Sequence, residues 1–135
     1  MTYSPRAVVI ALVVGTLAAC GHPGPASHGE RSAQVPASLN GISASQMVDD
    51  FRKAGLPALN PHDITAQECP KEHCLQGIST DTVSVFKFPT TGLAQRYIGS
   101  RSNVFQVEDL VLTFAPKLPG DLKQRYEREV EIAVQ

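Results

Sequence analysis

The sequence predicts an α+β domain in which a four-stranded, mainly antiparallel sheet of two hairpins packs in two layers with about three helices. Two pairs of short segments rich in β-branched and aromatic residues are each split by a polar turn, as in hairpins. Three other segments carry apolar residues at helical spacing. The order helix, hairpin, helix, hairpin, helix most economically gives one sheet covered by helices.

The first expected helix begins at Ala44. Ser43 and Gln46 have the spacing of a capping box, which satisfies free backbone amides at a helix start. Gly55, followed by Leu56-Pro57, is typical of a helix end because glycine adopts the left-handed conformation without strain. The expected apolar face of this helix consists of Met47, Val48, Phe51 and Ala54.

Four strands are expected after the cysteine-containing segment. Thr80-Asp81 and Glu108-Asp109 are polar pairs that favour turns, and each lies between two apolar segments. We therefore predict two hairpins. Their strands are Leu75 to Ser79 with Val83 to Phe88, and Val104 to Val107 with Leu110 to Phe114.

Two further helices complete the domain. Thr90 or Thr91 can cap a short helix that ends at Gly99, with Ala94, Tyr97 and Ile98 facing inward. The last helix is opened by Pro119-Gly120-Asp121. Its apolar stripe consists of Leu122, Tyr126, Val130, Ala133 and Val134.

The N-terminal segment has the pattern of an export signal. Arg6 supplies a positive charge before the uncharged run Ala7 to Ala19, which is shorter than the roughly 20 residues of a membrane span. Residues 1–19 are predicted to be a signal peptide and residues 20–41, rich in Gly, Pro, Ala and Ser, a disordered tether. Residues 42–135 are long enough for a single modest core.

The end of the signal, Leu17-Ala18-Ala19-Cys20, resembles the lipobox of bacterial lipoproteins. The resemblance implies that the sulfur of Cys20 receives a diacylglyceryl group and that the mature chain stays on the extracytoplasmic face of the cell membrane. An ordinary cleaved signal and an uncleaved transmembrane anchor are the alternatives.

The two remaining cysteines, Cys69 and Cys74, are expected to form a disulfide in an oxidising compartment. The four residues between them exceed the two of the usual redox-active motif. A metal site of both cysteines with His73 would need a fourth ligand, and the nearby candidate, His62, has no recognisable zinc spacing. Because a bridged loop displays its residues rigidly, Lys71, Glu72 and His73 are the candidate binding residues.

Composition argues against several functions. The formal net charge of −1 argues against nucleic acid as a partner. No nucleophile elbow or phosphate-binding glycine loop occurs, so we expect no catalytic residue, metal or cofactor. His62-Asp63 could be an acid/base pair, but a turn in which Asp63 bonds the following backbone is the stronger interpretation.

Taken together, the lipobox, the tether, Phe51 to Pro57, the cysteine pair and Thr80 to Phe86 resemble small actinobacterial, mycobacterial-type cell-envelope lipoproteins. This resemblance implies location and fold and carries no activity. We expect a non-catalytic accessory or binding protein of the envelope, held on the membrane through Cys20, with an envelope protein as partner. The alternatives are a metal-binding or ligand-binding protein or an enzyme that uses His62 and His73, and a carrier of an apolar molecule.

Overall fold

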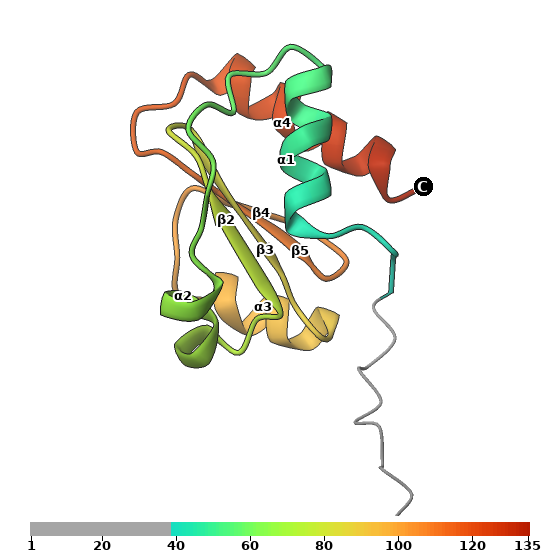
Figure 1. The fold of residues 1–135 in the computed structure, drawn as a ribbon, viewed down its shortest axis with the longest axis vertical. Coiled ribbons are helices and arrows are strands. Elements are labelled where there is room, and N and C mark those ends of the chain that lie inside the picture. Colours follow the sequence, from blue (N-terminus) through green and yellow to red (C-terminus); the bar gives the residue numbers. More distant parts are fainter. Residues whose placement is uncertain (1–38) are drawn as a thin grey trace, which may run out of the picture. The chain divides into compact units, whose positions relative to one another are not determined.

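The computed structural model describes residues 39–135, so the predicted signal peptide, Cys20 and most of the tether lie outside the described part. This part contains four helices and five strands (Figure 1). The helices are α1 (Ala44–Lys53), α2 (Thr65–Glu72), α3 (Thr91–Ile98) and α4 (Gly120–Ala133). The strands are β1 (His62–Asp63), β2 (Gln76–Ser79), β3 (Val83–Lys87), β4 (Val104–Val107) and β5 (Leu110–Phe114).

All five strands form one antiparallel sheet in the order β1-β2-β3-β5-β4. The two predicted hairpins, β2–β3 and β4–β5, are confirmed, and β5 is the strand that joins them by pairing with β3. Val85 in the central strand lies opposite Ile78 on one side and Leu112 on the other. The α+β class is therefore confirmed, with one strand and one helix more than expected.

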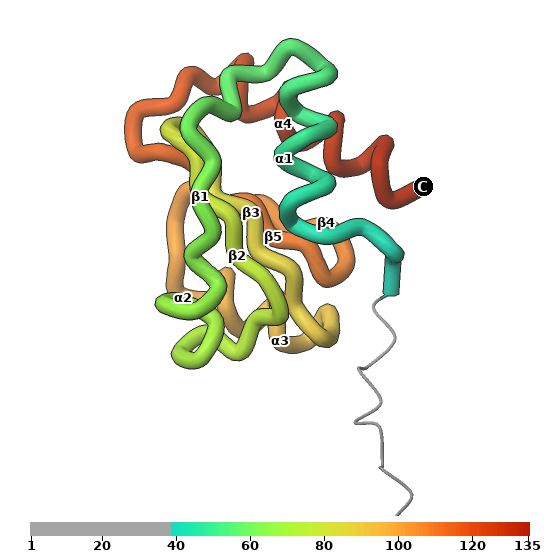
Figure 2. Tube along the Cα trace, in the orientation of Figure 1, coloured from blue at the N-terminus to red at the C-terminus, as the bar shows by residue number. Residues whose placement is uncertain are grey.

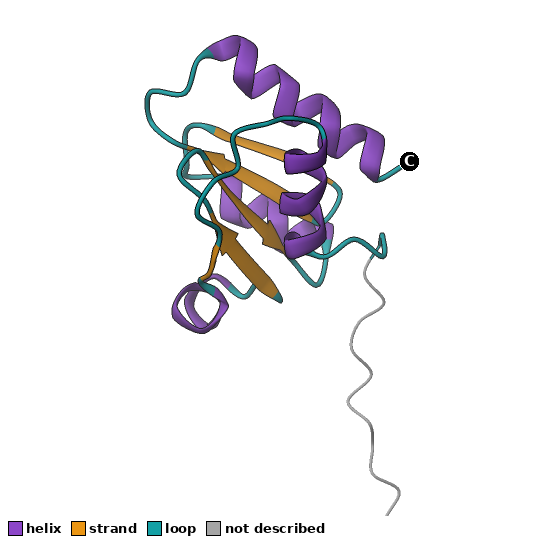
Figure 3. Ribbon diagram, turned by 45° about the horizontal axis from the view of Figure 1, so that its top comes forward, coloured by secondary structure: helices purple, strands orange, loops and turns teal. Residues whose placement is uncertain are grey.

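Helices cover both faces of the sheet, which corrects the two-layer prediction (Figure 3). Helices α1 and α4 pack on the face that carries Val85 and Leu112, where Phe51 and Tyr126 are fully buried. Helix α3 covers the opposite face. Because side chains alternate along a strand, the positions next to Val85 and Leu112 point toward α3. Together with residues of α3 they form a second core, which contains Phe86, Phe88, Ala94, Tyr97 and Val111.

The predicted ends of α1 are confirmed. The Ser43 hydroxyl accepts from the Gln46 amide at 3.1 Å, and the Gln46 side chain accepts from the Ser43 amide at 2.9 Å. At the other end Gly55 has a φ of 72°, and the Leu56 amide bonds the Phe51 carbonyl at 2.8 Å. Ala54, expected on the buried face, is instead exposed because it is already the capping residue.

The segment around the cysteines folds differently from the loop we expected. It contains the two-residue strand β1 and the helix α2, with Pro70 inside that helix. The sequence of α2 lacks an apolar stripe, and proline normally disfavours a helix interior, so no local pattern indicated it. Figure 2 shows that α2 lies beside the edge of the sheet formed by β1 and β2.

Candidate functional site

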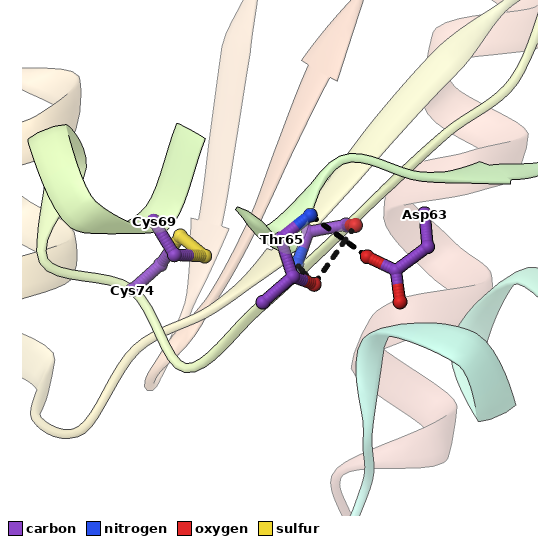
Figure 4. Close-up of a disulfide and its surroundings, with 5 residues drawn as sticks. Asp63, Thr65, Cys69 and Cys74 are labelled. Atoms are coloured by element: carbon purple, nitrogen blue, oxygen red, sulfur yellow. Dashed lines mark hydrogen bonds between the residues drawn. A yellow bond between two sulfur atoms is a disulfide. The ribbon is translucent and has the colours of Figure 1, made fainter. Parts of the chain in front are cut away.

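The predicted disulfide between Cys69 and Cys74 is present, with the two Cα atoms 4.6 Å apart (Figure 4). Cys69 lies in α2, and Cys74 follows the helix directly after His73, which caps α2 in the left-handed conformation with a φ of 59°. The bridge encloses the three candidate binding residues. It thereby ties the C-terminal turn of α2 to the start of the chain that leads into β2.

The N-terminal end of α2 is fixed to the sheet by Thr65. Its amide donates to Asp63 Oδ1 at 2.7 Å, and its hydroxyl accepts from the Gly77 amide at 3.0 Å (Figure 4). The first contact confirms that Asp63 bonds the following backbone, although His62 and Asp63 themselves form strand β1 and not a turn. Hydrogen bonds from Thr65 hold the pKa of Asp63 below its usual value because they favour the carboxylate.

Gly77 allows this close approach of α2 to the sheet. A Cβ at this position would lie 3.0 Å from a ring carbon of Phe86 and 3.1 Å from the side chain of Ile64. Phe86 is buried in the second core and Ile64 packs against that core, so a side chain at this position would have to displace packed neighbours. The glycine is therefore a packing requirement of β2.

A cleft of about 430 Å³ lies between the C-terminal end of α2 and helix α3. The predicted triplet forms one wall, and residues of α3 and the turn after it form the other. The lining residues are Lys71, Glu72, His73, Leu93, Arg96, Tyr97 and Arg101. The fold thus places the three neighbouring candidate residues next to residues that lie twenty or more positions away in the sequence. We name this hollow the α2–α3 cleft.

Arg101 joins the two walls of the α2–α3 cleft. One guanidinium nitrogen donates to the Tyr97 carbonyl at 2.7 Å and another to Glu72 Oε1 at 2.8 Å. The guanidinium carbon lies 3.9 Å from the centre of the Tyr97 ring, in a cation–π contact. Three simultaneous contacts fix this side chain, so Arg101 holds α2 and α3 together where they border the cleft.

Tyr97 is the buried residue of the cleft. Its ring packs against Phe86 and Phe88 in the second core, with centroids 5.1 and 5.2 Å away, and its hydroxyl lies 3.4 Å from that of Thr113. Burial raises the pKa of the phenol, because the phenolate would lose its hydration; the Thr113 contact and the charge of Arg101 oppose this effect only in part.

The two histidines of the alternative hypothesis line different hollows. His62 borders a hollow of about 180 Å³ with Asp49 of α1, and its Nδ1 lies 3.2 Å from the Asn60 carbonyl. His73 borders the α2–α3 cleft. Within residues 39–135, no three histidine, cysteine or acidic side chains are grouped as a metal site would require. The arrangement therefore does not favour a site that uses both histidines.

Sequence reasoning missed a buried charged cluster at the start of the described chain. Lys87 Nζ donates to Asp109 Oδ1 at 2.8 Å, and the side chains are 6% and 0% exposed. The same ammonium donates to the Asn40 carbonyl at 3.0 Å and to Asn40 Oδ1 at 2.6 Å. Asp109 accepts in turn from the Leu39 amide and from Asn40 Nδ2.

This cluster holds the last residues of the predicted tether against the domain. Residues 39 and 40 are bonded to the β4–β5 turn. The only sequence signal was a lysine at the end of an apolar strand and an aspartate in a turn, each of which is ordinarily solvated. Their pairing depends on the register that places Lys87 opposite Leu110, next to Asp109.

No helix in the described range is long and apolar enough to cross a bilayer. Comparison of the chain with profiles of known families, with curated proteins and with solved structures finds no match. The α2–α3 cleft is therefore identified by its geometry alone: a rigid, half-apolar hollow that a disulfide and a fixed arginine hold open on a folded domain.

Proposed function

We propose that the chain is a membrane-anchored extracytoplasmic lipoprotein that acts as a non-catalytic accessory or binding protein of the cell envelope, and that it binds through the α2–α3 cleft. The lipobox-like residues ending in Cys20 support the anchor. The cleft is the single observation that supports the binding role, because it is the place where the residues selected from sequence line a preformed hollow.

The construction of the cleft favours binding over a purely structural role. The disulfide, the contacts of Arg101 and those of Thr65 hold both ends of α2, so little order has to be gained when a ligand docks. Leu93 and Tyr97 offer apolar surface, while Lys71 and Arg96 are exposed polar contacts at the rim. A rigid hollow with a few polar groups is the usual form of a recognition site.

Site-specific photo-crosslinking in intact cells tests this proposal. A photo-reactive phenylalanine analogue replaces Leu93 in the cleft of the full chain, and the same analogue replaces Leu122, a half-buried leucine on α4 outside the cleft, as the matched control. We expect a cross-linked product from position 93 that is weak or absent from position 122. Equal products from both positions, or none from position 93, contradict binding through the cleft.

The anchor is tested in the same cells by fractionation. Cys20→Ala should move the chain out of the membrane fraction, since no sulfur is then available for the diacylglyceryl group. Loss of the position 93 product in this variant would show that binding depends on the membrane location. Full membrane retention of the Cys20→Ala chain contradicts the lipoprotein assignment and leaves the cleft experiment intact.

A further inference from the structure

We propose that the α2–α3 cleft binds the phosphate group of an organic phosphate monoester, with Lys71 and Arg96 as the direct cationic contacts. This inference rests on the proposed function, because it names the ligand chemistry of the same cleft. It is carried by the charges on the cleft walls, by their pairing and by the apolar surface between them.

The cationic side chains of the cleft differ in how they are paired. Arg101 has a carboxylate partner, Glu72, and is held by it. Lys71 and Arg96 are exposed, and neither has a carboxylate partner among residues 39–135. Two cations from different helices that border one hollow are a natural arrangement for an anion with several acceptor oxygens.

Negative charges near the cleft weaken the attraction of Lys71 and Arg96 for an anion that is not in direct contact with them. Glu68 is close enough to raise the pKa of Tyr97, and the C-terminal end of α2 carries about half a negative charge from its aligned peptide dipoles. The whole chain is also slightly acidic, with a formal net charge of −1. A diffuse positive field is therefore excluded as the source of affinity, and simple anions should bind poorly.

A phosphate group fits these conditions better than a carboxylate. The three terminal oxygens of a phosphate monoester can accept from the fork of Arg96 with two of them and from the ammonium of Lys71 with the third, whereas a carboxylate must share its two oxygens between both cations. The exposed ring of His73, on the same wall, can donate a further hydrogen bond.

The volume and lining of the cleft indicate that the phosphate carries an organic group. A hollow of about 430 Å³ is in the range of small-molecule sites and exceeds the needs of a bare anion. Leu93 and the edge of Tyr97 supply the apolar contact for the rest of the ligand. Such an ester has two possible sources, a soluble metabolite or a membrane lipid, and the chemistry at the phosphate is the same.

The test uses the full chain in non-ionic detergent micelles, with backbone amide chemical shifts as the readout. Glycerol 3-phosphate and dihexanoyl phosphatidic acid are titrated in parallel, with acetate as the simple anion. We expect saturable shifts confined to residues 71–73 and 93–101 for at least one ester, and none for acetate. Tighter binding of phosphatidic acid identifies a lipid source, and equal binding of both esters identifies a soluble one.

The matched variants are two double substitutions that remove the same charge. Lys71→Gln/Arg96→Gln should weaken binding at least about tenfold, the effect of losing one charge-assisted hydrogen bond. Lys117→Gln/Arg125→Gln, outside the cleft, should bind as the parent does. Absence of saturable ester binding, equal binding of acetate, or equal loss in both variants overturns the phosphate assignment.

The two proposals fail separately. If position 93 gives a specific cross-link and no ester binds, the cleft is a binding site and its ligand class is not phosphate. If the esters bind and no cross-link forms from position 93, the phosphate site stands while the proposed partner contact fails. If no cross-link forms from the cleft and no ester binds, the cleft is not a binding site.

Discussion

At the residue scale, the most unusual feature is the buried pair of Lys87 and Asp109. Charged groups are rarely buried unless their hydrogen bonds are satisfied, and here the two residues share contacts with Asn40 and Leu39. No buried side-chain nitrogen or oxygen in the described part lacks a partner. The pair therefore fixes where the chain enters the domain rather than contributing large net stability.

Lys87→Met should lower the free energy of unfolding by about 3–5 kcal/mol, because Asp109 is left buried without its cation. Urea denaturation of the full chain in detergent measures this change. Lys53→Met is the control, since Lys53 pairs with Asp50 at the surface with 76% of its side chain exposed, and it should change stability by no more than about 0.5 kcal/mol.

The double variant Lys87→Met/Asp109→Leu gives the decisive comparison. Removing both charges should recover part of the loss, since buried ion pairs are often replaceable by apolar side chains. A Lys87→Met chain as stable as the parent, or a double variant whose loss equals the sum of the two single losses, would contradict a coupled buried pair.

Tyr126 gives a prediction about alkaline pH. Burial raises the pKa of its phenol, and the hydrogen bond with the Thr82 hydroxyl at 2.8 Å and the charge of Arg125 oppose this only in part. Because the pKa is higher in the folded chain, the associated stabilisation is fully present below about pH 10 and is lost as pH rises through the folded value. Stability should therefore fall in the alkaline range.

Near-ultraviolet absorbance of tyrosinate, followed in the folded full chain, measures this titration. Tyr126→Phe should remove one late-titrating phenol and make stability less sensitive to pH above about 10. It should also cost about 1 kcal/mol at neutral pH, through the lost hydrogen bond to Thr82. A parent chain in which all tyrosines ionise at the ordinary value would contradict the effect of burial.

At the element scale, α2 is the helix that depends most on its attachments. It has eight residues, a proline inside and one buried residue, Cys69, whereas isolated helices shorter than about 12 residues are marginal in water. Its order comes from the disulfide at one end and Thr65 at the other. The cleft wall formed by α2 is therefore the part of the fold that a loss of the bridge should affect first.

Cys69→Ser/Cys74→Ser should lower the free energy of unfolding by less than about 3 kcal/mol, because the bridge closes only a short loop. Hydrogen exchange should quicken at the amides of residues 66–69 and 71–73 and stay slow in β3 and β5, where the core is continuous. Exchange in α2 that matches the parent would show that the helix does not need the disulfide.

The elements that were predictable from sequence carry their own local signals. The capping box at Ser43 and the two polar turns of the hairpins depend on residues three to six positions apart, so a single stretch of chain specifies them. In contrast, α2 has no apolar period, and its stability comes from a disulfide and from β2. The second core was missed because we expected a sheet with one apolar face. Apolar residues of β3 and β5 in fact occupy both faces, as in a sheet that is covered on both sides.

The candidate site divides in the same way. Lys71, Glu72 and His73 could be selected because the cysteines on either side of them are visible in the sequence. The opposite wall contains Arg96 and Arg101, and the packing of α3 on the sheet determines its position. No local sequence pattern predicts which segment α3 will face. The partner of Lys87 was hidden for the same reason, since strand register decides it.

At the scale of the whole molecule, the fixed start of the domain and the connection from α2 to β2 are both bonded to the end of β3. Residues 39 and 40 bond the end of β3 and the β4–β5 turn, and the Leu75 amide, just after the disulfide, donates to the Lys87 carbonyl at 2.7 Å. Lys87 therefore links both segments to the sheet, the first through its ammonium group and the second through its carbonyl. If Cys20 is the anchor, residues 39 and 40 are the described part of the chain nearest to it in sequence.

This arrangement makes a prediction about proteolytic release from membranes. Arg31 is the only lysine or arginine between Ala7 and Phe51, and it lies within the predicted tether. Brief trypsin treatment of membranes that carry the full chain should therefore cut first after Arg31 and release a fragment that begins at Ser32. The fragment should keep its folded core, since every residue of the sheet and its helices lies beyond the cut.

Mass spectrometry of the soluble fraction identifies the released fragment, and Arg31→Gln is the matched control. The control chain should stay on the membrane under the same treatment, because the remaining cleavage sites lie within the folded domain or before Cys20. Release of the Arg31→Gln chain at the parent rate, or a parent chain that remains bound after the cut, would show that the attachment to the membrane is not on the N-terminal side of Arg31.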